Sequence, residues 1–84
     1  MNALKPVLCP ILSSYLKKAR RASLFTQEQM ADQLGISARS YNNLEHGRSL
    51  CSTPVLILFM MSTNQDTILQ MFGDIRIAIG RAVE

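Results

Sequence analysis

Apolar residues recur at helical spacing through the first half of the chain, and residues that begin or end helices border each run. The first run starts at Pro10, which suits the first position of a helix because its missing N–H has no partner there. Its apolar members are Ile11, Leu12, Tyr15, Leu16 and Ala19. This spacing of three and four residues predicts an amphipathic helix.

Two shorter helices are predicted within residues 26–46, because both their starts and their ends carry signals. Thr26 and Gln29 are spaced as a capping box, in which a hydroxyl and an amide each bind a free backbone N–H. Gly35 suits the left-handed residue that ends a helix, and Ser37 can cap the next one. A helix of about eight residues, a turn of about three and a second helix make the spacing of a helix-turn-helix unit.

The second half of the chain is more apolar and less clearly patterned. Ser52 or Thr53 can cap a helix that has Pro54 at its first position and continues as VLILFMM. Thr63 or Asn64 can cap a last helix that runs to about Val83. One face of this last helix would hold Ile68, Phe72, Ile75, Ile79 and Ala82.

The runs VLILFMM and IRIAI also suit strands by composition, but the flanking caps favour helices. We therefore predict an all-α fold of about five helices, in a single domain over residues 1–84. The C-terminal helices at residues 52–84 carry more apolar surface than one small domain can cover. This excess predicts a homodimer.

Basic residues concentrate in the first half of the chain. Residues 1–51 hold seven basic and three acidic groups, whereas residues 52–84 hold two basic and three acidic groups. The whole chain has a net charge of +3. The first half is therefore the part suited to an anionic partner such as nucleic acid.

Several functional classes are disfavoured by composition. Two cysteines and one histidine cannot supply the four ligands of a structural zinc site, and we expect no metal, no cofactor and no enzymatic activity. The longest apolar run, residues 54–61, is far shorter than the roughly 18 residues that cross a bilayer. No secretory signal is evident, so we expect a cytoplasmic protein with two reduced thiols and no membrane contact.

The helix at residues 38–46 has two chemically different sides when it is projected at about 100° per residue. One side holds Ser40, Tyr41, Leu44 and Glu45, and the other holds Ala38, Arg39, Asn42, Asn43 and His46. The major groove of DNA admits one such helix. Arg39 can bind guanine O6 and N7, Asn42 or Asn43 can bind adenine, and Ala38 can contact a thymine methyl group.

Further polar residues are candidates for contacts with DNA phosphates, which position a protein without reading sequence. Gln27 lies at the start of the second helix, where the backbone N–H groups attract an anion. The other candidates are Ser37, Ser40, Arg48, Lys17 and Lys18.

Residues 26–37, followed by Leu44-Glu45-x-Gly47, resemble the helix-turn-helix domain of phage Cro, the phage repressors and the XRE-type bacterial regulators. Gln27, Ala31 and Gly35 match the family at the correct spacing, and the resemblance covers about residues 11–60. It implies a lambda-repressor-like fold, in which Gln27, Ala38, Arg39 and Asn43 occupy positions that touch DNA.

The resemblance also implies an ion pair. Arg20 stands seven residues before Gln27, where the family places an arginine that pairs with the glutamate matching Glu45. The chain departs from the family at Tyr41, where Ile or Val is usual, and at Leu24, which replaces a common glycine. Neither departure lies on the reading side of the helix.

We therefore expect a homodimeric regulator of transcription, a repressor, that reads double-stranded DNA with the helix at residues 38–46. An alternative is a protein-interaction module on the same fold, such as the antitoxin of a toxin–antitoxin pair, that binds a partner through residues 54–83. A purely structural helical protein is a third alternative, which would show no affinity for DNA even at low salt.

Overall fold

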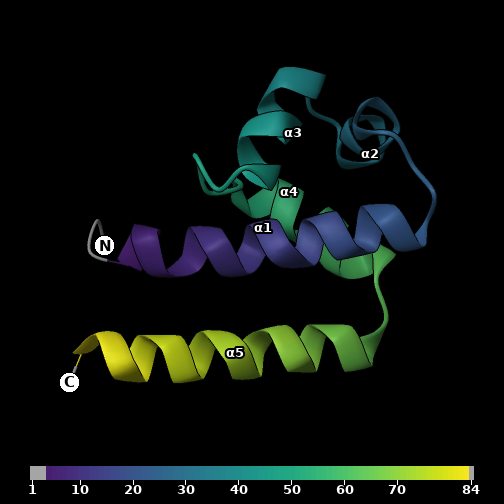
Figure 1. Ribbon diagram of the computed structural model, residues 1–84. Coiled ribbons are helices and arrows are strands. Elements are labelled where there is room, and N and C mark those ends of the chain that lie inside the picture. Colours follow the sequence, from purple (N-terminus) through teal and green to yellow (C-terminus); the bar gives the residue numbers. More distant parts are fainter. Residues whose placement is uncertain (1–3, 84) are drawn as a thin grey trace.

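The computed structural model describes residues 4–83, and these form five helices connected by short turns (Figure 1). The helices are α1 (Lys5–Ala22), α2 (Gln27–Leu34), α3 (Ala38–Glu45), α4 (Thr53–Ser62) and α5 (Gln65–Val83). The predicted all-α fold is confirmed. The strand alternative is wrong, because VLILFMM lies within α4 and IRIAI lies within α5.

The first helix begins earlier than predicted. It starts at Lys5, with Pro6 in its first turn, and Pro10 lies inside it. Pro10 removes one backbone hydrogen bond, but the added turns bring Cys9 into a buried position. The backbone of Cys9 then lies against Gly47, where a Cβ atom would stand 3.8 Å from the Cys9 carbonyl oxygen. This packing gives the N-terminal turns of α1 a tertiary contact that periodicity alone does not predict.

α1 is the central helix, because the other elements pack on different sides of it. Figure 1 shows α2 and α3 on one side of α1 and α5 on the opposite side, antiparallel to α1. α4 packs against α2. All five helices contribute to the buried core: Tyr15 and Leu16 from α1, Met30, Ala31 and Leu34 from α2, Tyr41 and Leu44 from α3, Val55 and Phe59 from α4, and Met71 from α5.

The last helix is rotated relative to the prediction. Met71 is its buried residue, with 1% of its surface exposed, whereas Phe72 is 45% exposed and Ala82 is exposed. Ile68, Ile75 and Ile79 are half-buried beside Met71. Within residues 4–83 the main contact of α5 is with α1, so a narrow stripe of α5 is buried. The unbranched side chain of Met71 is suited to reach from that stripe into the core.

Three turns use the same backbone hydrogen-bond pattern to end a helix. After α2, Gly35 takes a left-handed φ of 68°, and Ile36 N–H binds the Ala31 carbonyl at 3.0 Å. Gly47 does the same after α3. After α1 the left-handed residue is Leu24, with φ 59° and 89% of its surface exposed. The leucine at this turn therefore adopts the backbone conformation that a glycine would favour.

Candidate nucleic-acid interface

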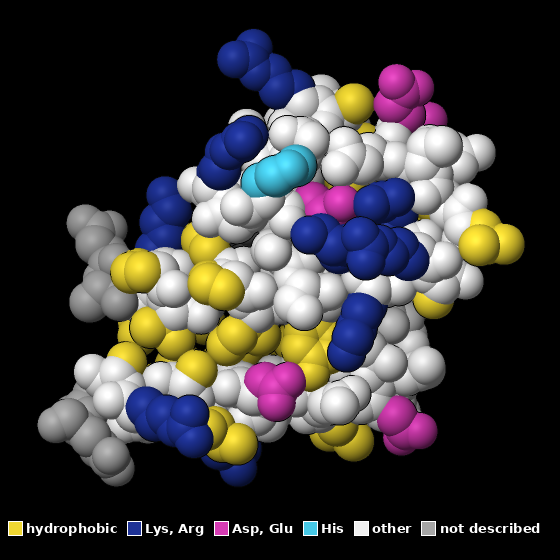
Figure 2. Space-filling view, in the orientation of Figure 1, with side chains coloured by type: hydrophobic (Ala, Val, Ile, Leu, Met, Phe, Trp, Pro, Cys, Tyr) yellow, Lys and Arg dark blue, Asp and Glu magenta, His cyan; other side chains and the backbone are white. Residues whose placement is uncertain are grey.

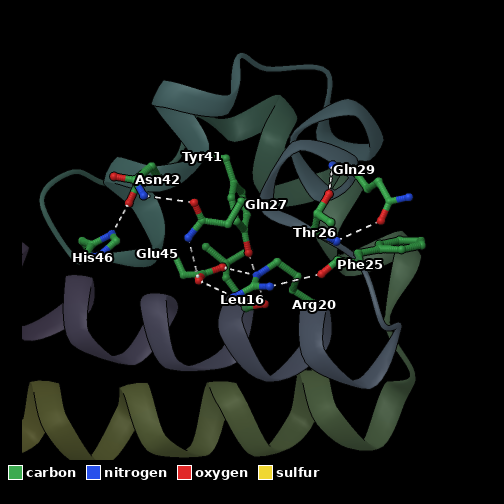
Figure 3. A network of polar contacts seen from close by, with 10 residues as sticks. All are labelled: Leu16, Arg20, Phe25, Thr26, Gln27, Gln29, Tyr41, Asn42, Glu45 and His46. Atoms are coloured by element: carbon green, nitrogen blue, oxygen red, sulfur yellow. Dashed lines mark hydrogen bonds and ion pairs between the residues drawn. The ribbon is translucent and has the colours of Figure 1, made fainter.

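A charged contact fixes α3 on α1. Arg20 of α1 donates from Nε to Oε2 of Glu45 at 2.7 Å and from Nη2 to Oε1 at 2.8 Å (Figure 3). The ion pair between Arg20 and Glu45 that the resemblance implied is therefore present, and it is bidentate. A third donor, Nη1 of Arg20, binds the Phe25 carbonyl at 3.1 Å. One guanidinium thus connects α1, the last turn of α3 and the turn that leads into α2.

The contact extends to the exposed side of α3 through Gln27. The amide nitrogen of Gln27 donates to Oε1 of Glu45 at 3.1 Å, and its oxygen accepts from Nδ2 of Asn42 at 3.0 Å (Figure 3). Sequence reasoning missed this bridge, because it depends on how closely α2 crosses α3. No short-range pattern carries that information. The bridge sets the orientation of Asn42 from the inside of the fold.

The electrostatics of Glu45 follow from these contacts. Burial of the Glu45 carboxylate raises its pKa. Hydrogen bonds, of which the one from Arg20 has the largest effect, outweigh burial and lower the pKa to about 2. Only 3% of Glu45 is exposed. The carboxylate therefore remains charged and paired with Arg20 across the neutral pH range.

Tyr41 takes the place of the family's branched residue without leaving a polar atom unpaired. Its side chain is completely buried, and its hydroxyl donates to the Leu16 carbonyl at 3.4 Å. Burial also raises the pKa of Tyr41, so the hydroxyl stays protonated. No buried side-chain nitrogen or oxygen within residues 4–83 lacks a hydrogen-bond partner.

The opposite side of α3 is open. Ala38 and Arg39 are exposed in its first turn, and Asn42 and Asn43 are half-buried. Arg48 reaches back from the following turn, and its Nη1 lies 3.5 Å from Oδ1 of Asn42 and 3.4 Å from Oδ1 of Asn43. The side-chain nitrogen of Asn43, Nδ2, makes no hydrogen bond to the described residues. Donors, acceptors and a guanidinium are thus presented together on a short helix.

The candidate phosphate-binding residues lie at both ends of α3 and on α1. Ser37 and Ser40 are exposed at the start of α3, where Oγ of Ser37 caps the helix by accepting from the Ser40 N–H at 3.1 Å. Arg48 is exposed near the end of α3, and Lys17 is half-buried on α1. Lys18 is exposed on α1, with its Nζ 5.6 Å from the centre of the Tyr15 ring, and it borders a hollow formed by the last turns of α1, the end of α4 and the start of α5.

Basic side chains and apolar side chains occupy different parts of the surface. Figure 2 shows Lys and Arg side chains gathered over α1 to α3 around the single histidine, and a band of hydrophobic side chains between α1 and α5. The histidine, His46, ends α3, and its Nδ1 lies 2.8 Å from the Asn42 carbonyl oxygen. This position suits a residue that ends a helix.

None of the helices in residues 4–83 is long and apolar enough to span a membrane.

A comparison with protein families adds one finding to this geometry. The family described as "Helix-turn-helix domain" matches residues 14–76, from within α1 to within α5. No curated protein and no solved structure matches the chain. The matched range contains the ion pair, the bridge through Gln27 and the whole exposed side of α3.

Proposed function

This chain belongs to the family of helix-turn-helix domains, and from that membership we propose that it is a DNA-binding repressor of transcription. Within that family it resembles phage Cro, the phage repressors and the XRE-type regulators. The observation that carries the proposal is the division of α3 into an anchored side and an open side. Tyr41, Leu44 and Glu45 hold the helix, while Arg39 and Asn43 are left for a ligand.

The open side matches the chemistry of base edges in the major groove. The fork of Arg39 fits guanine O6 and N7, the amides of Asn42 and Asn43 fit adenine, and each such pair discriminates by about 1–3 kcal/mol. Arg48 lies next to both amides, so its charge also falls at the edge of the groove. Phosphates would be bound by Arg48, Ser37, Ser40, Lys17 and the backbone N–H groups at the start of α2, where Gln27 is the first residue.

The protein is proposed to bind DNA as a homodimer. Large apolar side chains remain exposed on the C-terminal helices: Ile57, Leu58 and Met61 on α4, and Leu69, Phe72 and Ile77 on α5. Two-fold related recognition helices read half-sites one turn of DNA apart, so a second copy on this surface serves both needs. Covering these side chains would also stabilise so small a domain.

The α5 helix favours a symmetric contact centred on Gly73. A glycine inside a helix costs about 1 kcal/mol relative to alanine. A Cβ atom at Gly73 or Gly80 would meet nothing within 4 Å, so packing within one chain does not require either glycine. Gly73 lies midway between Leu69 and Ile77 along the chain. An antiparallel pair of α5 helices with its two-fold axis at Gly73 would place Leu69 opposite Ile77 of the second copy.

The DNA-reading role is tested by replacing Arg39. An operator would first be selected from random duplex DNA, and an inverted repeat is expected. Arg39→Ala should then weaken binding to that operator about 10- to 100-fold and change binding to unrelated DNA little. The matched control is Arg81→Ala, which removes the same charge from α5. If the two variants behave alike, Arg39 does not read sequence.

The dimer is tested by sedimentation at micromolar concentration. Ile77→Arg should give a monomer and should weaken operator binding, because it places a charge within the proposed contact between two α5 helices. A wild-type chain that is monomeric both free and on DNA would contradict the dimer. A chain in which Arg39→Ala is harmless and substitutions within residues 54–83 abolish function would instead be a protein-interaction module.

A further inference from the structure

A cleft between α1 and α5 lies apart from the DNA-binding surface. Its volume is about 400 Å³, which is within the range of sites that bind small molecules. Pro10, Ile11 and Tyr15 line it from α1, and Asp74, Ile77 and Ala78 line it from α5. Figure 2 shows hydrophobic side chains along the boundary between these two helices. Ser14 and Arg81 complete the lining, so the cleft combines apolar side chains with the Tyr15 hydroxyl, one carboxylate and one guanidinium.

One carboxylate is held at this cleft. The hydroxyl of Tyr15 donates a hydrogen bond to Oδ2 of Asp74, and the Tyr15 side chain is itself 5% exposed. The hydrogen bond to Asp74, burial and the charge of Asp74 raise the pKa of Tyr15 to about 12. The phenol is therefore a donor at neutral pH. A buried group thus fixes one oxygen of Asp74 and leaves the other oxygen for another molecule.

The charge of Asp74 is not cancelled by a direct ion pair. Among the described residues, Asp74 has no basic side chain within 4.0 Å, although Arg81 also lines the cleft. A carboxylate at this position repels phosphate, so the cleft does not extend the proposed DNA-binding surface. The Asp74 carboxylate itself attracts a cation, and the apolar side chains on both walls beside it favour a cation that carries a hydrophobic group.

We propose that the cleft between α1 and α5 binds a small organic amine, with its cationic group on Asp74 and its apolar body between Ile11 and Ile77. A protonated primary amine or a quaternary ammonium with an aromatic or branched alkyl group has this chemistry. Ile77 also belongs to the proposed dimer surface, so an occupant would influence operator binding. That last step depends on the proposed function, whereas the binding of the amine does not.

The binding site is tested by titrating the full chain, without DNA, with 2-phenylethylamine and following backbone amide resonances. Saturable shifts are expected at residues around Ser14 and Ala78. The control compound, 3-phenylpropionate, has a similar body and the opposite charge. It should bind at least about tenfold more weakly, because a charged contact with Asp74 is replaced by repulsion.

Two substitutions locate the amine. Asp74→Asn keeps an acceptor for Tyr15 but removes the charge, and it should weaken binding about tenfold or more. Asp66→Asn makes the same change on α5 outside the cleft and should have no effect. Ala78→Leu fills the cleft and should also abolish binding, which covers the case that Asp74→Asn disturbs the fold. The proposal is overturned if the shifts do not saturate, if both compounds bind equally, or if the Asp74 and Asp66 variants bind the amine alike.

Discussion

The two sides of α1 are held in different ways. On the side of α2 and α3, Arg20 makes three hydrogen bonds to Glu45 and Phe25, and Gln27 extends this network to Asn42. On the side of α5, Met71 is buried and a single side-chain hydrogen bond joins Tyr15 to Asp74. The first side is closed within the chain. The second leaves Leu69 and Ile77 exposed by 67% and 58%.

Helix length explains why the two sides can differ. α2 and α3 have eight residues each, and helices this short are not stable alone in water. They need caps, buried side chains and the ion pair to keep one orientation. α5 has nineteen residues, so more of its own hydrogen bonds support it, and it can be covered on one side only. The pair α2 and α3 therefore holds its side chains in fixed positions, and α5 keeps an exposed apolar side that a second molecule could cover.

The largest expected effect comes from breaking the closed side. Glu45→Ala would leave the guanidinium of Arg20 partly buried without its carboxylate, and the free energy of unfolding should fall by about 3 kcal/mol. Urea denaturation followed by circular dichroism measures this change. The control is Glu28→Ala, which removes an exposed acid from the first turn of α2 and should cost less than about 1 kcal/mol. Equal losses would show that the ion pair does not hold α3.

The same contact should make stability depend on acid. The pKa of Glu45 is about 2 in the fold, below its ordinary value of 4.5, so the folded state holds the carboxylate charged. This contribution, about 2–3 kcal/mol, is complete above pH 4.5 and is lost as the pH falls towards 2. Unfolding curves measured from pH 7 to pH 2 should show the decline. In Glu45→Gln the decline over this range should be smaller by that amount.

A smaller effect is expected on the side of α5. Tyr15→Phe removes the hydrogen bond to Asp74 but leaves the buried ring, and the exposed carboxylate can be solvated instead. The free energy of unfolding should fall by about 1 kcal/mol. Urea denaturation of this variant beside Glu45→Ala compares the two sides of α1 directly. A loss as large as that of Glu45→Ala would mean that α5 is held as firmly as α3.

Local signals predicted the closed side well, because they act within a few residues. The capping box of Thr26 and Gln29 forms with both of its hydrogen bonds, and Ser37 caps α3. The projection of α3 also placed Tyr41, Leu44 and Glu45 inward correctly, although Ser40, assigned to the same side, is exposed. These features depend on residue type and spacing, which a sequence states directly.

The features that sequence could not give depend on distance between helices. Phe72 and Met71 are both apolar, so the pattern in α5 allows either to face α1, and only the position of α5 decides for Met71. The bridge from Asn42 to Glu45 through Gln27 requires the crossing of α2 and α3. The early start of α1 likewise depends on the contact between Cys9 and Gly47. Each is a consequence of packing between elements.

The smallest expected effect lies at the turn from α1 into α2, and it is a gain. A leucine in the left-handed conformation is strained by about 1–2 kcal/mol, and Leu24 is too exposed to recover this by burial. Leu24→Gly relieves the strain but makes the unfolded chain more flexible, so a net gain of about 0.5 kcal/mol is expected. Thermal unfolding should show a slightly higher midpoint.

Gly35 provides the reciprocal test, because its turn has the same hydrogen-bond pattern with the opposite residue choice. A Cβ atom at Gly35 would meet nothing within 4 Å, so Gly35→Ala reports backbone strain alone and should cost about 1 kcal/mol. If Leu24→Gly destabilises the chain instead, the flexibility that glycine adds to the unfolded chain outweighs the relieved backbone strain, and Gly35→Ala should then cost less than about 1 kcal/mol.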